Sequence, residues 1–244
     1  MKKTNVKSKA LFYSLMLSIV LMSFPVVSGI IVAVNNMEVP QSYWVQGAFM
    51  LLSVTVPVGI LLITGVRPSQ IGFVGMRKGS LKTVLYFIPV IMAKAGFLFF
   101  GINHDIERII ALTFFTAAIG LSEEIYFRGI ILKRVKMCFS IKQTVLLSSI
   151  LFATVHASQA FSGEGFVMVT MAVLNSLIFG IVAAEIVILT GSLIPAMIWH
   201  TLYNFINWVS PVQGTTEIIL IVVQSIALIA YGIYLWRKLY IIKL

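Results

Sequence analysis

The chain has 244 residues, of which 59% are hydrophobic and only 11% are charged, and its mean hydropathy is +1.02. Soluble domains carry roughly 25% charged residues, so the composition excludes an ordinary soluble protein and predicts an all-α polytopic membrane protein. The single cysteine, Cys138, excludes an intrachain disulfide. We find no linker, repeat or low-complexity segment, and therefore expect one membrane-embedded domain over residues 1–244.

Eight apolar stretches are candidates to cross the membrane as helices. In chain order they are about residues 10–34, 43–66, 83–102, 109–132, 141–157, 166–189, 193–209 and 218–236. Basic residues precede the first stretch, which is also typical of a cleaved signal peptide. At about 25 residues it is too long for a signal core, so we expect a retained span. Short loops at residues 162–165 and 190–192 flank the sixth span.

The basic residues gather on one side of this eight-span arrangement. If successive spans alternate in direction, 15 of the 18 Lys and Arg residues share one face, Arg108 lies opposite, and Lys94 and Arg128 lie within spans. The shared face holds Lys2, Lys3, Lys7, Lys9, Arg67, Arg77, Lys78, Lys82, Lys133, Arg134, Lys136, Lys142, Arg237, Lys238 and Lys243. The positive-inside rule puts both termini in the cytoplasm, and it explains the net charge of +10 without nucleic-acid binding.

The fourth span carries Glu123, Glu124 and Arg128 inside an apolar run. A charge at the centre of a membrane helix costs at least ~2.5–3.5 kcal/mol, so these groups must pair or line a wet cavity. Glu124 and Arg128 are spaced as an i,i+4 ion pair. Glu123 projects about 100° away and keeps a less satisfied carboxylate, which suits a general base. A structural ion pair locking two helices would account for Glu124 and Arg128 but not for Glu123.

Three further polar residues lie inside apolar spans: His156 in the fifth, and His200 and Asn204 in the seventh. A lone membrane histidine is usually an interhelical hydrogen-bonding residue. Counted from the basic face at about 1.5 Å per residue, however, Glu123 and these three residues all fall in the middle of a ~30 Å core. Convergence at one depth predicts a single polar cavity within the bundle.

The motifs Glu123-Glu124-xxx-Arg128, Phe152-xxx-His156 and His200-xxx-Asn204 resemble, in this order, those of the CAAX-protease and bacteriocin-processing family of intramembrane glutamate endopeptidases. Phe127-Arg128-Gly129 is also typical of that family. The resemblance covers about residues 109–209, whereas the first three spans and the last carry no motif that we identify. It implies an eight-helix fold and hydrolysis of peptide bonds.

The same resemblance assigns roles to individual residues. It implies that Glu123 is the base that activates water, that Glu124 and Arg128 support the site, and that His156 assists the base or binds the water. His200 and Asn204 would stabilise the developing oxyanion. It implies no cofactor, and as partners a membrane-associated peptide or protein substrate and the lipid bilayer. For Phe152, simple packing and a role in shaping the pocket both stay open.

Three other functions compete with this one. Glu123, His156 and His200 could ligate zinc in a metal-dependent protease, with Asn204 outside the ligand set. A non-catalytic immunity or scaffold protein could bind a toxin or a sensor kinase. Buried ionisable groups also mark ion paths in transporters, although we find no inverted repeat.

Other sequence features exclude several classes of hydrolase and indicate a bacterial origin. Asp105 is the only aspartate, which excludes an aspartyl dyad, and no Gly-x-Ser-x-Gly or His-Glu-x-x-His motif occurs. Lys94 has no evident partner beyond an ion pair with an acid of the site. The Lys- and Ile-rich chain favours a bacterial cell-membrane protein, with a role in peptide or bacteriocin maturation, signalling or self-immunity. The substrate is not identified by the sequence.

Overall fold

The computed structural model describes residues 2–162 and 165–241, and the regular elements in these residues are all helices. The predicted loop residues Gly163 and Glu164 and the basic residue Lys243 lie outside them. The α-helices are α1 (Lys2–Val34), α2 (Gln41–Ser53), α3 (Thr55–Thr64), α4 (Leu81–Leu85), α5 (Ile88–Ala95), α6 (Ile106–Glu124), α7 (Leu132–Lys136), α8 (Ile141–His156), α9 (Phe166–Thr190), α10 (Ile194–Val209) and α11 (Thr215–Ile241). Short 3₁₀ segments are η1 (Pro68–Ile71), η2 (Gly96–Phe100) and η4 (Ala157–Ser162), and η3 (Ile125–Ile131) is a π-helix. The predicted all-α class is confirmed.

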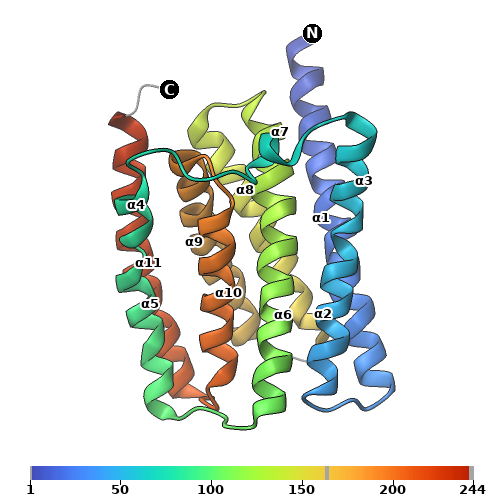
Figure 1. Cartoon of the computed structure of the whole chain (residues 1–244), viewed down its shortest axis with the longest axis vertical. Coiled ribbons are helices and arrows are strands. Elements are labelled where there is room, and N and C mark those ends of the chain that lie inside the picture. The colour runs from blue at the N-terminus through green and yellow to red at the C-terminus, as the bar shows by residue number, and fades with distance from the viewer. Residues whose placement is uncertain (1, 163–164, 242–244) are drawn as a thin grey trace.

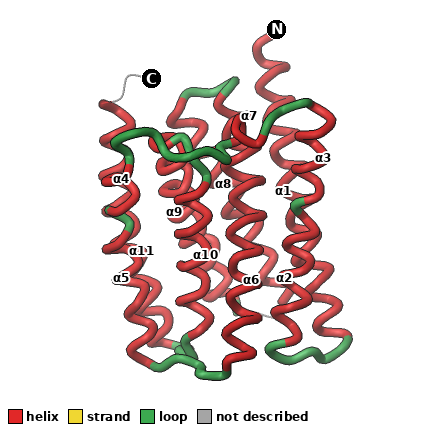
Figure 2. The backbone as a smooth tube through the Cα atoms, viewed as in Figure 1, coloured by secondary structure: helices red, strands yellow, loops and turns green. Residues whose placement is uncertain are grey.

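The helices lie side by side in one bundle, and the loops gather at its two ends (Figures 1 and 2). Six helical segments are long and apolar enough to cross a membrane: Asn5–Val34, Gln41–Thr64, Leu81–Phe100, Ile106–Lys136, Phe166–Thr190 and Thr215–Leu239. The helices α8 and α10 match the other two predicted spans but have only 16 residues each. That length is about 24 Å at about 1.5 Å per residue, so the count of eight spans stays a prediction.

Two of the predicted spans are broken rather than continuous. The second consists of α2 and α3, and the third consists of α4, α5 and η2. Pro57 lies in the first turn of α3 and Pro89 in the first turn of α5. A proline has no N–H for the preceding turn and its ring clashes with that turn, so the breaks before α3 and before α5 have a local cause.

The motif-bearing helices occupy the middle of the bundle. The apolar windows of Ile106–Lys136 and Phe166–Thr190 are 67% and 61% buried, against 17–33% for the other four membrane-length segments. Within the bundle, α6 packs against α2 and α10, and α8 packs against α9. The peripheral helices therefore surround α6, η3 and α9, and these carry the charged groups.

A loop between α3 and α4, residues 72–80, crosses the end of the bundle above α10 (Figure 1). We call it the strap. The amide of Arg77 donates to the carbonyl of Thr190 at 2.9 Å, and the hydroxyl of Ser192 donates to the carbonyl of Val74 at 2.6 Å. The amide of Leu193 donates to the carbonyl of Gly72 at 2.9 Å. Gly72 has φ +106°, and a Cβ there would lie 2.9 Å from Leu193, so only glycine fits this contact.

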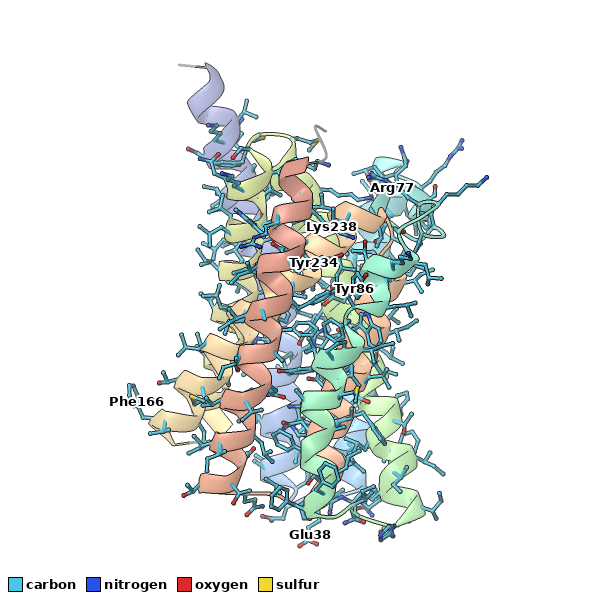
Figure 3. The ribbon with its side chains drawn as sticks, turned by 90° about the vertical axis from the view of Figure 1, so that its left-hand side faces the viewer. Glu38, Arg77, Tyr86, Phe166, Tyr234 and Lys238 are labelled. Carbon is cyan, nitrogen blue, oxygen red and sulfur yellow. The ribbon has the colours of Figure 1, made fainter. Side chains whose placement is uncertain are left out.

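The two ends of the bundle differ in charge. Arg77 and Lys238 lie toward the end that carries both termini, and Glu38 lies at the opposite end (Figure 3). At the basic end, the Lys238 ammonium lies 4.9 Å from the ring centroid of Tyr234 and 5.8 Å from that of Tyr86. Aromatic and basic side chains of this kind are typical of a membrane–water interface. That both described ends of the chain share the basic face agrees with the predicted topology.

Candidate active site

Glu123 and Glu124 end α6, at the point where the helix widens into the π-helix Ile125–Ile131. A π-helical turn is rare and frequently marks a functional site, because the extra residue per turn redirects the side chains that follow. Arg128 lies within this segment. The wider turn does not separate the predicted i,i+4 pair: Nη1 of Arg128 lies 2.9 Å from Oε1 of Glu124.

Glu124 holds two cationic or polar partners at once. Its Oε1 accepts hydrogen bonds from Arg128 at 2.9 Å and from Nδ1 of His200 in α10 at 3.0 Å. The other end of the guanidinium donates to the carbonyl of Gly180 in α9 at 3.2 Å. The Glu124 carboxylate therefore joins α6, η3 and α10 directly, and Arg128 extends the link to α9. The Glu124 side chain has no exposed surface.

The hydrogen bond to Glu124 fixes the proton on one nitrogen of His200. A carboxylate oxygen only accepts, so Nδ1 of His200 must carry a hydrogen, as assigned from the hydrogen-bond partners. Nε2 of the same ring then faces Oε2 of Glu123 at 3.7 Å, slightly beyond hydrogen-bond range. The imidazole is thus held between the two glutamates, with one nitrogen toward each.

Glu123 has a different environment from Glu124. Its residue surface is 8% exposed, whereas that of Glu124 is 0% exposed. Its Oε2 is buried and accepts no hydrogen bond from the described part of the chain. Glu123 is therefore the more exposed and the less hydrogen-bonded of the two neighbouring glutamates.

His156 ends α8 and is half-buried. Its Nδ1 lies 3.0 Å from the carbonyl of Phe152, one turn earlier. Because a carbonyl only accepts, Nδ1 carries the hydrogen and Nε2 keeps its lone pair. The ring of Phe152 contacts both His156 and His200, and His200 lies 3.7 Å from Glu123, so the structure brings the two histidines and Glu123 into one region.

Phe152 lies in this region and contacts three of its polar side chains, and its role in packing or in shaping the pocket stays open. Its ring lies 4.3 Å from the Arg128 guanidinium, and its centroid lies 4.8 Å from that of His156 and 5.8 Å from that of His200. An aromatic face over a guanidinium is favourable. Phe179 of α9, which no motif pointed to, covers His200 from the other side with ring centroids 4.8 Å apart.

Asn204 follows His200 by one helical turn on α10 and is half-buried. None of the hydrogen bonds found among the described side chains involves it. The structure therefore places Asn204 on the predicted helix, without fixing the direction of its amide.

Two glycines set the distances between the site helices, and sequence reasoning missed both. A Cβ on Gly120 of α6 would lie 2.4 Å from the hydroxyl of Thr201 and 3.0 Å from the carbonyl of Met197, both in α10. A Cβ on Gly180 of α9 would lie 3.1 Å from Cβ of Ser149 in α8. A small residue inside a long apolar helix is the signal that could have found them, because small residues let membrane helices approach closely.

Lys94 does not pair with a glutamate of the site. Its ammonium instead donates to Oδ1 of Asn207 in α10 at 2.6 Å and lies 4.4 Å and 4.3 Å from the ring centroids of Phe97 and Tyr203. The ion pair considered from the sequence is therefore replaced by an amide oxygen and two aromatic faces.

Within the described residues, no group of three His, Cys, Asp or Glu side chains is arranged to hold a metal ion. Glu123 and His200 approach each other, but Nδ1 of His156 is turned toward the carbonyl of its own helix. A chelation experiment tests whether the protein is instead a metal-dependent protease.

Comparison with known proteins locates the motifs in a family. The family model described as type II CAAX prenyl endopeptidase, Rce1-like, matches residues 105–206. No curated protein and no solved structure matches the chain. The matched residues include the glutamate pair, Arg128, both site histidines and Asn204. Residues 105–206 are thus similar to the Rce1-like type II CAAX prenyl endopeptidases, a family of proteases, and this match agrees with the resemblance that the motifs carry.

Proposed function

We propose that this protein is an intramembrane endopeptidase that hydrolyses a membrane-associated peptide or protein with water activated by Glu123. The supporting observation is the contrast between the two neighbouring glutamates. Glu124 is fully enclosed and accepts hydrogen bonds from Arg128 and His200, whereas Glu123 is 8% exposed and its Oε2 accepts no hydrogen bond from the described part of the chain. A general base must be able to reach water and gain a proton, and Glu123 meets both conditions.

The charges of the site balance when His200 is protonated. Buried charges are tolerated only when they are paired, and the two carboxylates then face one guanidinium and one imidazolium. Protonation also satisfies the geometry, because both nitrogens of His200 face a glutamate oxygen, at 3.0 Å and 3.7 Å. Glu124 in this arrangement orients the His200 ring through the hydrogen bond to Nδ1.

Hydrolysis then follows in two steps. Glu123 removes a proton from a water molecule beside it, and the water oxygen attacks the carbonyl carbon of the scissile peptide bond. His156 accepts a hydrogen bond from the same water through Nε2, which orients the attack. The tetrahedral intermediate collapses when its C–N bond breaks and Glu123 returns the proton to the leaving amine.

His200 and Asn204 supply the donors for the negative oxygen of that intermediate. Asn204 follows His200 by one helical turn on α10, and Nε2 of His200 lies 3.7 Å from Oε2 of Glu123. Preorganised donors of this kind contribute roughly 2.7–4 kcal/mol each in soluble hydrolases.

The name of the matched family points to prenylated substrates, and these are the first to test. The basic end of the bundle, which carries both described ends of the chain, would face the cytoplasm. A role in peptide or bacteriocin maturation, signalling or self-immunity in a bacterial membrane is part of the same proposal.

The experiment is a cleavage assay on the full chain purified in detergent. The substrates are short peptides ending in Cys-aliphatic-aliphatic-X, with and without an S-farnesyl group, and products are read by mass spectrometry. We expect cleavage by the wild type, loss of cleavage by at least about a hundredfold in Glu123→Gln, and no effect of a chelator. Inhibition by the chelator would favour the zinc-dependent alternative. Biological complementation by Glu123→Gln would favour a non-catalytic immunity or scaffold protein.

A further inference from the structure

A second buried polar cluster lies one to two turns beyond the site, around Lys94 of α5. The side chain is 1% exposed, and its ammonium donates to Oδ1 of Asn207 at 2.6 Å. The faces of Phe97 and Tyr203 enclose the ammonium, and Glu217 adds an attractive negative charge. Burial of a lysine is costly unless its hydrogens are used, so this arrangement needs an explanation.

Lys94 determines which way the amide of Asn207 points. An ammonium has three donors and no acceptor, so only the oxygen of the amide can face it. The opposite orientation would put the amide nitrogen against a cation. Nδ2 of Asn207 is therefore directed away from Lys94, and its hydrogens donate to no acceptor found in the described part of the chain. Asn207 is half-buried, so this nitrogen is not sealed in the core.

Asn207 continues the polar face of α10 that begins at the site. His200, Asn204 and Asn207 are spaced by four and three residues, which places them on one face of the helix. The distance along the axis from His200 to Asn207 is about 10 Å at about 1.5 Å per residue. An extended peptide advances about 3.3 Å per residue, so this face spans about three residues of a bound chain.

A second asparagine near this cluster, Asn175, has hydrogen-bond partners on neighbouring helices. Oδ1 of Asn175 in α9 accepts hydrogen bonds from the hydroxyls of Tyr203 at 3.0 Å and Ser225 at 3.2 Å. Asn175 thus joins α9, α10 and α11. It lies on α9 and is not part of the polar face of α10 that carries His200. The two asparagines have similar surroundings but different positions relative to the site.

We propose that Asn207 is a substrate-binding residue that donates from Nδ2 to a backbone carbonyl of the bound peptide, and that Lys94 is its positioning residue. The inference rests on the proposed endopeptidase function and extends it to the part of the peptide that lies along α10, away from the scissile bond. A backbone carbonyl is the chemical group that a fixed amide donor recognises without regard to side chain.

The test compares isosteric variants in binding and in catalysis. Asn207→Asp keeps the oxygen that faces Lys94 but removes both donor hydrogens, and Asn175→Asp is the matched control. Binding of a fluorescein-labelled, S-farnesylated Cys-aliphatic-aliphatic-X peptide is measured in the Glu123→Gln background, so no cleavage intervenes. We expect roughly five- to tenfold weaker binding for Asn207→Asp, the effect of one neutral hydrogen bond, and no change for Asn175→Asp.

Kinetics on the active protein separate binding from structural damage. Asn207→Asp should raise KM by the same factor with kcat and the thermal midpoint close to wild type. Lys94→Met, which releases the amide, should also raise KM, and Lys94→Arg, which restores a donor, should recover it. Unchanged binding in Asn207→Asp, or equal weakening in Asn175→Asp, overturns the inference. If the wild type binds the peptide but cleaves nothing, the proposed function fails while the binding comparison can still be read.

Discussion

Nδ1 of His200 and Oε1 of Glu124 lie 3.0 Å apart, although the two residues come from different helices and are separated by 76 positions in the chain. Because Arg128 also binds that oxygen, the orientation of His200 depends on an ion pair within the fourth span. Glu124 therefore links α6 to α10 and orients the His200 ring. The neighbouring Glu123 has no such hydrogen bond at its Oε2 within the described part of the chain.

Glu124→Ala should destabilise the protein as well as inactivate it. The change leaves the Arg128 guanidinium, which is 1% exposed, without its carboxylate, and loss of one partner of a buried pair costs roughly 3–5 kcal/mol. Unfolding by sodium dodecyl sulfate in mixed micelles measures this free energy. Glu38→Ala, at an exposed position, is the control. Wild-type stability in Glu124→Ala would contradict the role of this carboxylate as the link between α6 and α10.

Asn204→Ala should lower kcat by roughly a hundredfold with little change in KM. The reason is that an oxyanion donor acts on the transition state and contributes little to the ground state. Steady-state kinetics with the farnesylated peptide give the two constants separately. Leu202→Ala, on the lipid-exposed side of the same helix, is expected to leave both unchanged. A rise in KM alone would assign Asn204 to substrate binding instead.

Gly120→Val should separate α6 from α10 and reduce activity by more than about tenfold. The added side chain would meet Thr201 and the backbone of Met197 at 2.4–3.2 Å, so α10 must move and carry His200 with it. Overpacking of this kind costs roughly 1–3 kcal/mol. Gly59→Val is a matched control, since no atom lies within 4 Å of the Cβ position there. Equal activity of the two variants would show that the close approach at Gly120 is not needed for the site.

The two short helices should both cross the membrane. In a Cys138→Ser background, single cysteines at Lys136 and Ala157 bracket α8, and cysteines at Ile194 and Gln213 bracket α10. Each pair is expected to react with a membrane-impermeant maleimide from opposite sides in intact cells and inverted vesicles. Labelling of either pair from one side would remove that helix from the count of eight spans.

Much of this structure could be read from the sequence because membrane segments are defined by continuous apolar runs. Each of the eight predicted ranges falls on helical segments of the described residues, although the second and third are broken and α1 begins at Lys2 rather than at about residue 10. The pairing of Glu124 with Arg128 followed from spacing alone. His200 could be assigned to the same depth as Glu123, and the structure brings their side chains to 3.7 Å.

The features that were missed depend on contacts between helices. The π-helix at Ile125–Ile131 has no periodic signature, because one extra residue per turn leaves the apolar run unchanged. The partner of Lys94 was not evident, since Asn207 lies 113 positions away and carries no charge. Nothing in the apolar pattern indicated that Glu124 would bind His200 as well as Arg128.

The strap has a consequence for how small an active fragment can be. Residues 105–206 carry every motif, yet the start of α10 is tied by backbone and hydroxyl hydrogen bonds to Gly72 and Val74, which lie before that segment. A truncated chain beginning near residue 105 would keep all the site residues. It would lose the strap, whose hydrogen bonds fix the start of α10 and with it the position of His200 along the bundle. Activity is therefore expected to require the N-terminal portion as well, although it carries no motif, because its strap residues hold the start of α10 in place.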